Sequence, residues 1–280
     1  MLIIWGAGRA ISTKLSIVDT HAHLDMAPFS QDRALVIARA RESGVSTIIT
    51  VGTNLNSSRE AITLAESYPE VWAAVGFHPH EVTQVNELDI ANLAQIAVHP
   101  RVVAIGEVGL DFYRNYSPRD SQLKALKWQL ELAVRLNLAV IIHCRRAESD
   151  LIPLLGDWTL ADKRPQKTPR GVIHCFSGDI DTARQYLEMG FFISFGAYIG
   201  YPASANLASV IRSIPRDRLV VETDCPFLPP QGRRGKRNEP AYLPSTVKLL
   251  AEIRGAPFEQ IAEETTANAR RLFRLATFTG

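Results

Sequence analysis

The sequence has 280 residues, of which 46% are hydrophobic and 21% are charged, with 17 glycines and 16 prolines. These are ordinary values for a globular protein, so they exclude an intrinsically disordered, collagen-like or fibrous chain. Lysine and arginine total 31 against 29 aspartate and glutamate, and the resulting charge of +2 neither requires nor excludes a nucleic-acid partner.

Residues 1–16 contain one short apolar run with no basic residue before it. We expect neither a signal peptide nor a membrane span, because a span needs about 20 consecutive apolar residues. The three cysteines cannot form a disulfide scaffold and are typical of a reducing compartment, so we expect a cytoplasmic protein. We interpret residues 1–16 as an N-terminal extension and residues 17–280 as a single domain.

Eight short runs of apolar, mostly β-branched residues follow this segment, and each is predicted to be a strand. Strands with so few polar interruptions suit a parallel sheet that is covered by helices. The runs are 17–18, 45–51, 71–75, 102–105, 138–142, 171–173, 191–195 and 219–221.

The segments between these runs have the pattern of amphipathic helices. Residues 32–42 form one such segment, with Gly44 at the position of a C-terminal cap. A longer helix is predicted over 118–136, with Ser117 as its N-terminal cap. The pattern of residues 244–273 predicts two final helices that close the structure.

Eight strands alternating with helices predict a single-domain α/β protein, a (β/α)8 TIM barrel. The alternative is an open, doubly wound sheet, but its glycine-rich phosphate loop is missing. Gly6 and Gly8 begin such a pattern, whereas Ile11 stands where the third glycine belongs. In a barrel the C-terminal ends of all the strands share one face, which is where active sites form.

Six of the seven histidines lie at or just beyond the C-terminal end of a predicted strand. His21 and His23 end the first strand two residues apart, so both side chains should point to the same side. This pair is either half of a metal site or a buried hydrogen-bonded pair. His143 and His174 end the fifth and sixth strands, whereas His99 precedes the fourth strand and is expected to be structural or solvated.

Two carboxylates occupy corresponding positions, Glu107 between glycines after the fourth run and Asp224 after the eighth. A buried glutamate is costly unless it is paired or ligated. Because one ion takes three or four protein ligands, six candidates indicate two divalent ions, with Glu107 as the natural bridge. Imidazole-rich sites favour Zn²⁺, Mn²⁺ or Ni²⁺. The six candidates are His21, His23, Glu107, His143, His174 and Asp224.

In chain order, the segments DTHAHLD, GFHPH, GEVGLDFY, IIHCRRA, HCFSG and ETDCPFL resemble the TatD family of metal-dependent deoxyribonucleases. The likeness extends over residues 17–273, whereas family members commonly begin close to the DTH motif. The resemblance implies a TIM barrel that uses Mg²⁺ to cleave DNA phosphodiester bonds, often from the 3′ end. It assigns one ion to His21, His23 and Asp224, a second to His143 and His174, and both to Glu107.

Basic residues around the same rim predict contacts with DNA phosphates. Residues 231–237 (QGRRGKR) place four cations close to Asp224, although a charged run of this kind can also be a solvated loop. Such contacts read the backbone, so we expect weak sequence preference. The predicted substrate-contacting residues are His78, His80, Arg145, Arg233, Arg234, Lys236 and Arg237. His78 and His80 either contact phosphate or support the ligands, and neither is expected to bind an ion. Asp111, Asn238 and Glu239 are predicted to support the ligands without binding an ion.

Further residues lie at this rim without a single assignment. Arg114 and Arg146 are predicted to join the phosphate contacts. The aromatic side chains at positions 77, 112, 113 and 227 either stack on unpaired bases or pack in the wall of the site.

The leading hypothesis is a monomeric, two-metal deoxyribonuclease that acts as a 3′–5′ exonuclease on single-stranded ends. Glu107 and Asp224 are its predicted catalytic residues, with Asp224 either binding an ion only or also accepting a proton from the attacking water. Two alternatives are an amidohydrolase of a small amide or lactone and a non-catalytic metal-binding scaffold. The fold cannot separate the two enzyme classes, but an arginine-rich rim favours phosphate.

Overall fold

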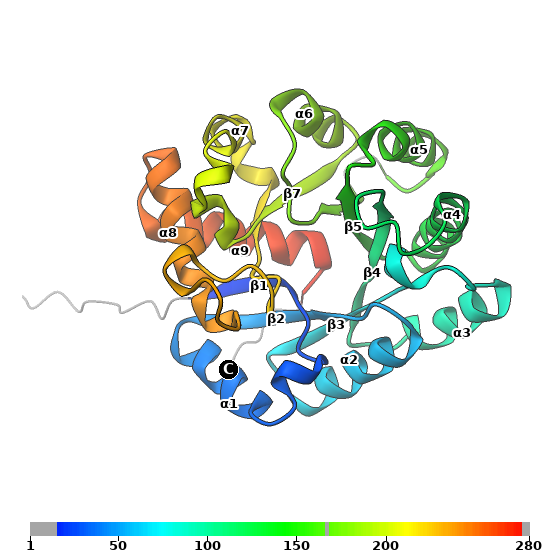
Figure 1. Cartoon of the computed structure of the whole chain (residues 1–280), viewed down its shortest axis with the longest axis horizontal. Helices are drawn as coiled ribbons and strands as arrows, with labels where there is room; N and C mark the ends of the chain where they lie inside the picture. Colours follow the sequence, from blue (N-terminus) through cyan, green and yellow to red (C-terminus); the bar gives the residue numbers. More distant parts are fainter. Residues whose placement is uncertain (1–15, 166–167, 276–280) are drawn as a thin grey trace, which may run out of the picture.

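Eight parallel strands, each hydrogen-bonded to the next in chain order, form a barrel at the centre of the protein (Figure 1). The structure is a computed structural model that describes residues 16–165 and 168–275. The first and last strands meet where the Asp224 amide donates to the carbonyl oxygen of His21 at 2.9 Å. All eight predicted strands are present. They are β1 (Ile17–Ala22), β2 (Val45–Val51), β3 (Val71–Val75), β4 (Val102–Asp111), β5 (Ala139–Arg145), β6 (Gly171–Ile173), β7 (Phe191–Phe195) and β8 (Leu219–Val221).

Strand β4 is longer than predicted, since it continues to Asp111 and does not end at Ile105. The apolar run stops at Ile105, but the glycines beyond it allow β4 and β5 to approach closely. A Cβ atom on Gly109 would lie 2.0 Å from the carbonyl oxygen of His143. Glu107 therefore lies inside a paired strand and not in a loop.

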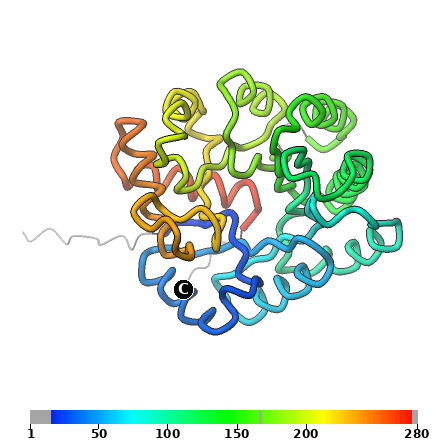
Figure 2. Tube along the Cα trace, in the orientation of Figure 1, coloured from blue at the N-terminus to red at the C-terminus, as the bar shows by residue number. Residues whose placement is uncertain are grey.

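Helices surround the barrel, so the outer faces of the strands are buried against them (Figures 1 and 2). The two predicted final helices are present as α8 and α9. In the described part of the chain the helices are α1 (Arg33–Glu42), α2 (Leu55–Ser67), α3 (Glu87–Ala97), α4 (Arg119–Leu136), α5 (Glu148–Ala161), α6 (Ile180–Glu188), α7 (Leu207–Ser213), α8 (Leu243–Arg254) and α9 (Phe258–Phe273).

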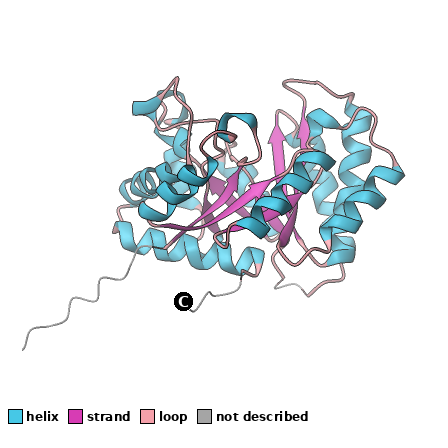
Figure 3. Cartoon of the chain, turned by 90° about the horizontal axis from the view of Figure 1, so that it is seen from below, coloured by secondary structure: helices cyan, strands magenta, loops and turns pink. Residues whose placement is uncertain are grey.

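Helix α9 closes the end of the barrel from which the strands start. Asn268 Nδ2 donates to the carbonyl oxygen of Leu219, the first residue of β8, at 2.8 Å. Figure 3 shows the helix that leads to the C-terminus lying across this end. One buried cluster joins α9 to every strand, and it includes Val18, Ile49, Ala74, Val103, Ile141, Val172, Phe192, Val220, Ala269, Leu272 and Phe273.

The start of α4 differs from the prediction by one residue. The helix begins at Arg119, so Pro118 takes the N-cap position predicted for Ser117. The Ser117 hydroxyl instead donates to the carbonyl oxygen of His80 at 3.0 Å and accepts the amide of Val82 at 3.2 Å. Ser117 therefore connects the loop after β4 to the segment after β3, and both segments border the site.

Within residues 16–165 and 168–275, no helix combines the length and apolar character needed to cross a membrane. The predicted N-terminal extension, residues 1–16, lies outside the described residues except for Ser16. The boundary between this extension and the domain stays a prediction.

Candidate metal centre

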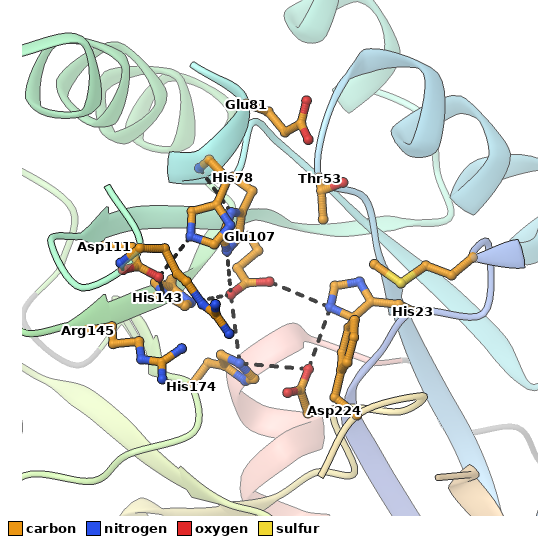
Figure 4. A pocket seen from close by; sticks show the side chains of 14 residues that line it. His23, Thr53, His78, Glu81, Glu107, Asp111, His143, Arg145, His174 and Asp224 are labelled. Carbon is orange, nitrogen blue, oxygen red and sulfur yellow. Dashed lines mark hydrogen bonds and ion pairs between the residues drawn. The ribbon is translucent and has the colours of Figure 1, made fainter. Parts of the chain in front are cut away.

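Side chains from β1, β4, β5, β6 and β8, or from the residues directly after them, meet at the end of the barrel opposite α9. They surround a cavity of about 330 Å³ (Figure 4). The convergence follows from the parallel strands, whose C-terminal ends lie on one face. The structure brings together all six predicted ligands, His21, His23, Glu107, His143, His174 and Asp224.

Four donor atoms form a first group around β1. His21 and His23 present their Nε2 atoms to each other at 3.2 Å. Glu107 Oε2 lies 3.4 Å from the Nε2 atom of His21 and 3.6 Å from that of His23, and the corresponding distances from Asp224 Oδ1 are 3.8 and 3.6 Å. Four ligands arranged as a tetrahedron at about 2.0–2.1 Å from an ion are about 3.4 Å apart. The group therefore has the spacing of a divalent-cation site.

In two histidines, the contacts of the Nδ1 atom show that the lone pair is on the Nε2 atom, which faces the centre. His23 Nδ1 lies 2.8 Å from the carbonyl oxygen of Val51, and His174 Nδ1 lies 2.9 Å from Glu222 Oε1. Because a carbonyl or carboxylate oxygen accepts, each Nδ1 carries the hydrogen in the neutral ring. Both Nε2 atoms are then free to bind a cation, which is the usual arrangement of histidine ligands.

The second oxygen of Glu107 faces a different set of imidazoles. Glu107 Oε1 lies 2.7 Å from His143 Nδ1, 3.4 Å from His78 Nε2 and 3.7 Å from His174 Nε2. We predicted a phosphate contact for His78, and the structure places it in a group with Glu107 and His143 that could hold an ion. The GFHPH segment that carries His78 follows β3, so its position at the same rim was visible in the sequence.

Asp111 supports this second group from behind. Its Oδ2 atom lies 2.8 Å from His80 Nε2 and 3.2 Å from His143 Nε2. Burial by itself raises the pKa of Asp111, but hydrogen bonds from His143, from the Arg114 amide and from His80 hold that pKa well below its usual range. An ionised Asp111 therefore fixes the ring of His143 so that its Nδ1 atom faces Glu107.

Glu222 is a supporting residue that the sequence interpretation did not assign. Besides contacting His174, its Oε1 atom accepts the amide of Cys175 at 2.8 Å, and its Oε2 atom accepts the hydroxyl of Ser194 at 2.7 Å. Glu222 precedes Asp224 by two residues, and this spacing was the available signal.

The carboxylates make positive charge favourable at two of the candidate ligands, His23 and His174. Burial by itself lowers the pKa of His23, but a hydrogen bond to Asp224 and the charge of Glu107 raise that pKa to about 9. Burial likewise lowers the pKa of His174, whereas Glu222 and Glu107 raise it to about 10. Burial raises the pKa of Glu107, and the surrounding histidines hold it well below its ordinary value. The field that favours protons on these imidazoles also favours divalent cations in their place.

Known proteins share both the sequence pattern and the fold. Residues 18–274 match the protein family described as TatD related DNase. The chain belongs to the TatD family. It is 39% identical over 259 residues to the uncharacterized metal-dependent hydrolase YabD of Bacillus subtilis. The aligned residues cover 92% of this chain and 99% of the relative.

Two further comparisons support the same conclusion. Over 264 residues the chain is 39% identical to the 3′-5′ ssDNA/RNA exonuclease TatD of Pectobacterium atrosepticum, with 92% and 99% of the two chains covered. The crystal structure of YjjV, a TatD homolog from Escherichia coli K12, superposes with a TM-score of 0.86 at 33% identity, covering 93% of this chain and 98% of that chain. The predicted family, TIM barrel and hydrolase class are confirmed.

The predicted substrate contacts of this TatD-family chain fall into two places. His78, His80 and Arg145 line the cavity, together with Arg114. The loop at 231–236 is exposed and does not contribute to the lining. Its Arg233 lies 4.3 Å from the ring centre of Tyr242, its Arg234 lies 4.7 Å from that of Tyr201, and Lys236 lies on the same exposed stretch.

Arg237 lies where it pairs with acidic residues of the protein itself. Its Nη2 atom lies 2.7 Å from Asp32 Oδ2 and 2.9 Å from Glu239 Oε1. Glu239 also accepts from Arg39 Nε at 2.8 Å, so this end of the loop is tied to α1. These pairs indicate that Arg237 positions the loop. They do not favour the predicted contact between Arg237 and phosphate.

Asn238 holds the segment that follows Asp224. Its Nδ2 atom donates to the carbonyl oxygens of Thr223 at 2.8 Å and Phe227 at 2.7 Å. Since Asn238 is fully buried, these bonds are shielded from water. The backbone on both sides of Asp224 is therefore fixed from one side chain.

Proposed function

We propose that this TatD-family protein is a two-metal exonuclease that removes nucleotides from the 3′ ends of single-stranded DNA. The observation that carries the proposal is Glu107, whose two oxygen atoms each lie within 3.7 Å of a different set of histidine nitrogens. A carboxylate in that position can bridge two ions, and centres with two ions suit the hydrolysis of phosphodiesters. The activity named for the Pectobacterium relative supports the choice of substrate.

The donor atoms suggest how two ions would be shared. Bound divalent ions supply Lewis acidity to the scissile phosphate and lower the pKa of a water molecule towards neutrality. We propose Mg²⁺ as the ion used in catalysis, while the imidazole-rich donor set would bind Zn²⁺, Mn²⁺ or Ni²⁺ more tightly. One ion would be held by His21, His23 and Asp224, the second by His143 and His174 with His78 beside them, and both by Glu107.

The residues of the chain itself perform three further tasks. The carboxylate of Asp224 faces the first group while its side chain remains 14% exposed to the cavity, so it can accept a proton from water. Arg145 and Arg114 line the same cavity and can bind a phosphate of the substrate strand. Asp111 and Glu222 keep the rings of two ligands in place.

Incubation of labelled oligonucleotides with the purified protein tests this function. Single-stranded and double-stranded DNA, and single-stranded RNA, carry the label at the 5′ end in one set and at the 3′ end in another. Each substrate is incubated with Mg²⁺, Mn²⁺, Zn²⁺ or Ni²⁺ and the products are separated by length. We expect the 5′-labelled single strand to shorten one nucleotide at a time, and only when a divalent ion is present.

Two results would contradict the proposal in different ways. A 5′-labelled strand that releases its label directly as a mononucleotide while the 3′-labelled strand shortens stepwise would reverse the polarity. A protein that leaves every nucleic acid intact but hydrolyses N-acyl amino acids or lactones with the same ions would be an amidohydrolase. Asp224→Asn serves as the control for contaminating nucleases, because it preserves the shape of the side chain and removes its charge.

A further inference from the structure

Four residues form an aromatic and basic cluster where β4 and β5 end, at the edge of the cavity. We call Tyr113, Arg114, Arg145 and Arg146 the rim cluster. The guanidinium carbon of Arg145 lies 4.1 Å from the ring centre of Tyr113, that of Arg146 lies 4.7 Å away, and that of Arg114 lies 5.8 Å away. Tyr113 itself is 47% exposed. Three cations thus surround one ring that is open to solvent.

In the described residues, the guanidinium groups of the rim cluster form no ion pair with an acidic side chain. Among the residues that the structure describes, no carboxylate oxygen lies within 4.0 Å of the guanidinium groups of Arg114, Arg145 or Arg146, whereas Arg237 has two such partners. Like charges held close together repel one another unless an anion lies among them. The cluster therefore has the charge pattern of an anion-binding site.

The backbone fixes the rim cluster relative to the metal centre. Asp111 Oδ1 accepts the amides of Tyr113 at 3.0 Å and Arg114 at 2.8 Å, while Asp111 Oδ2 contacts His143. The amide of Phe112 donates to the carbonyl oxygen of Arg145 at 3.0 Å, which joins the two loops. One carboxylate thus positions both a metal-ligand candidate and the rim cluster, so their separation is set by rigid elements.

The rim cluster lies on one side of the cavity, and an exposed aromatic side chain lies on the other. Phe227 follows β8, which is four strands away from β4 in the closed order, and its side chain is 50% exposed. Its ring centre lies 6.1 Å from that of His23, and it lines the same cavity as Arg114 and Arg145. A strand crossing the cavity would therefore meet Phe227, then the metal centre, then the rim cluster.

We propose that the rim cluster binds a backbone phosphate next to the scissile one and thereby makes the enzyme prefer oligonucleotides to dinucleotides. This inference rests on the proposed nuclease function. Contact with the ring of Tyr113 restrains the guanidinium groups while their N–H donors stay available to phosphate oxygens. Because phosphate contacts carry no sequence information, the site recognises strand length and not base identity.

A length series of thymidine oligonucleotides without terminal phosphates tests the inference, since a dinucleotide contains the scissile phosphate alone. For the wild-type enzyme with Mg²⁺ we expect kcat/KM to rise about tenfold when a second phosphate can reach the rim cluster. In Arg145→Gln/Arg146→Gln we expect this rise to disappear. The slope of log kcat/KM against log salt should also fall in magnitude by about 0.7 for long strands, because each neutralised phosphate of single-stranded DNA contributes about 0.7.

Arg41→Gln/Arg135→Gln is the matched control, because it removes the same charge from the last turns of α1 and α4. We expect this variant to keep the length dependence and the salt slope of the wild type. The inference is overturned if wild-type kcat/KM does not depend on length, if the rim variant keeps the dependence, or if the control loses it as well. In those cases hydrolysis itself still occurs, whereas an enzyme that cleaves no oligonucleotide at all contradicts the proposed function.

Discussion

Replacing Glu222 by glutamine removes a charge behind His174 and preserves the shape of the side chain. Glu222 Oε1 contacts both His174 Nδ1 and the amide of Cys175, at 2.9 and 2.8 Å, and Oε2 accepts the hydroxyl of Ser194 at 2.7 Å. A glutamine can direct its carbonyl oxygen to the first two donors and its amide to the oxygen of Ser194, whose hydroxyl can rotate. The substitution therefore removes the charge that lies 2.9 Å from His174 Nδ1 and leaves the hydrogen bonds to Cys175 and Ser194 in place.

The magnitude of the effect follows from the loss of that charge. A hydrogen bond to a charged group contributes about 1.5–3 kcal/mol and a neutral one about 0.5–1.5 kcal/mol, so Glu222→Gln should weaken the ion at His174 by about 1–1.5 kcal/mol, or roughly tenfold. Glu222→Ala also removes the hydrogen bonds, and we expect a loss of up to about a hundredfold. Calorimetric titration of metal-free protein with Mn²⁺ measures both values.

The activity of the same variants distinguishes a lower affinity for the ion from a disrupted arrangement of the ligands. We expect kcat of Glu222→Gln to recover at saturating Mn²⁺, because the ligands themselves are intact. Glu131→Gln, an exposed position on α4, removes the same charge and should bind Mn²⁺ as the wild type does. A folded Glu222→Gln protein with wild-type affinity for Mn²⁺ would refute the role given to Glu222.

Four further variants test other parts of the structure. Glu107→Ala should lose both ions and nearly all activity, and elemental analysis that still finds two equivalents of metal would contradict the bridge. Neutralising Arg233, Arg234 and Lys236 should lower the salt slope of DNA binding by about 2, since each of three contacts contributes about 0.7, and an unchanged slope would remove this loop from the substrate path. Arg237→Gln should instead lower the melting temperature and leave that slope unchanged, because its partners are Asp32 and Glu239. Gly109→Ala places a Cβ atom 2.0 Å from the carbonyl oxygen of His143 and should destabilise the fold by about 1–3 kcal/mol or more, so a wild-type melting temperature would show that β4 and β5 can separate without cost.

The fold and the convergence of the six candidate ligands could be predicted because both depend on local sequence patterns. Each strand is a short apolar run, and parallel strands bring their C-terminal ends to one rim. A polar residue at the end of an apolar run can therefore be placed at this rim before its contacts with other side chains are known. His21, Glu107 and His174 meet for this reason, although 153 residues separate the first from the last.

The partners of individual side chains could not be predicted in the same way. Arg237 pairs with Asp32, 205 residues earlier in the chain, and a charged run gives no sign of which member is paired. Glu222 contacts the imidazole of His174 through a rotamer that strand alternation does not determine. The end of β4 was predicted at Ile105, where the apolar run stops, whereas the strand continues through Gly109, which the close approach of β5 requires.

Anomalous diffraction from a crystal soaked in Mn²⁺ tests the two-metal centre most directly. Two strong peaks about 3.5–4 Å apart are expected, one on each side of the Glu107 carboxylate. The first should lie among His21, His23 and Asp224, and the second beside His143 and His174. A single peak, or two peaks that do not share Glu107, would contradict the bridging geometry and the two-metal mechanism proposed from it.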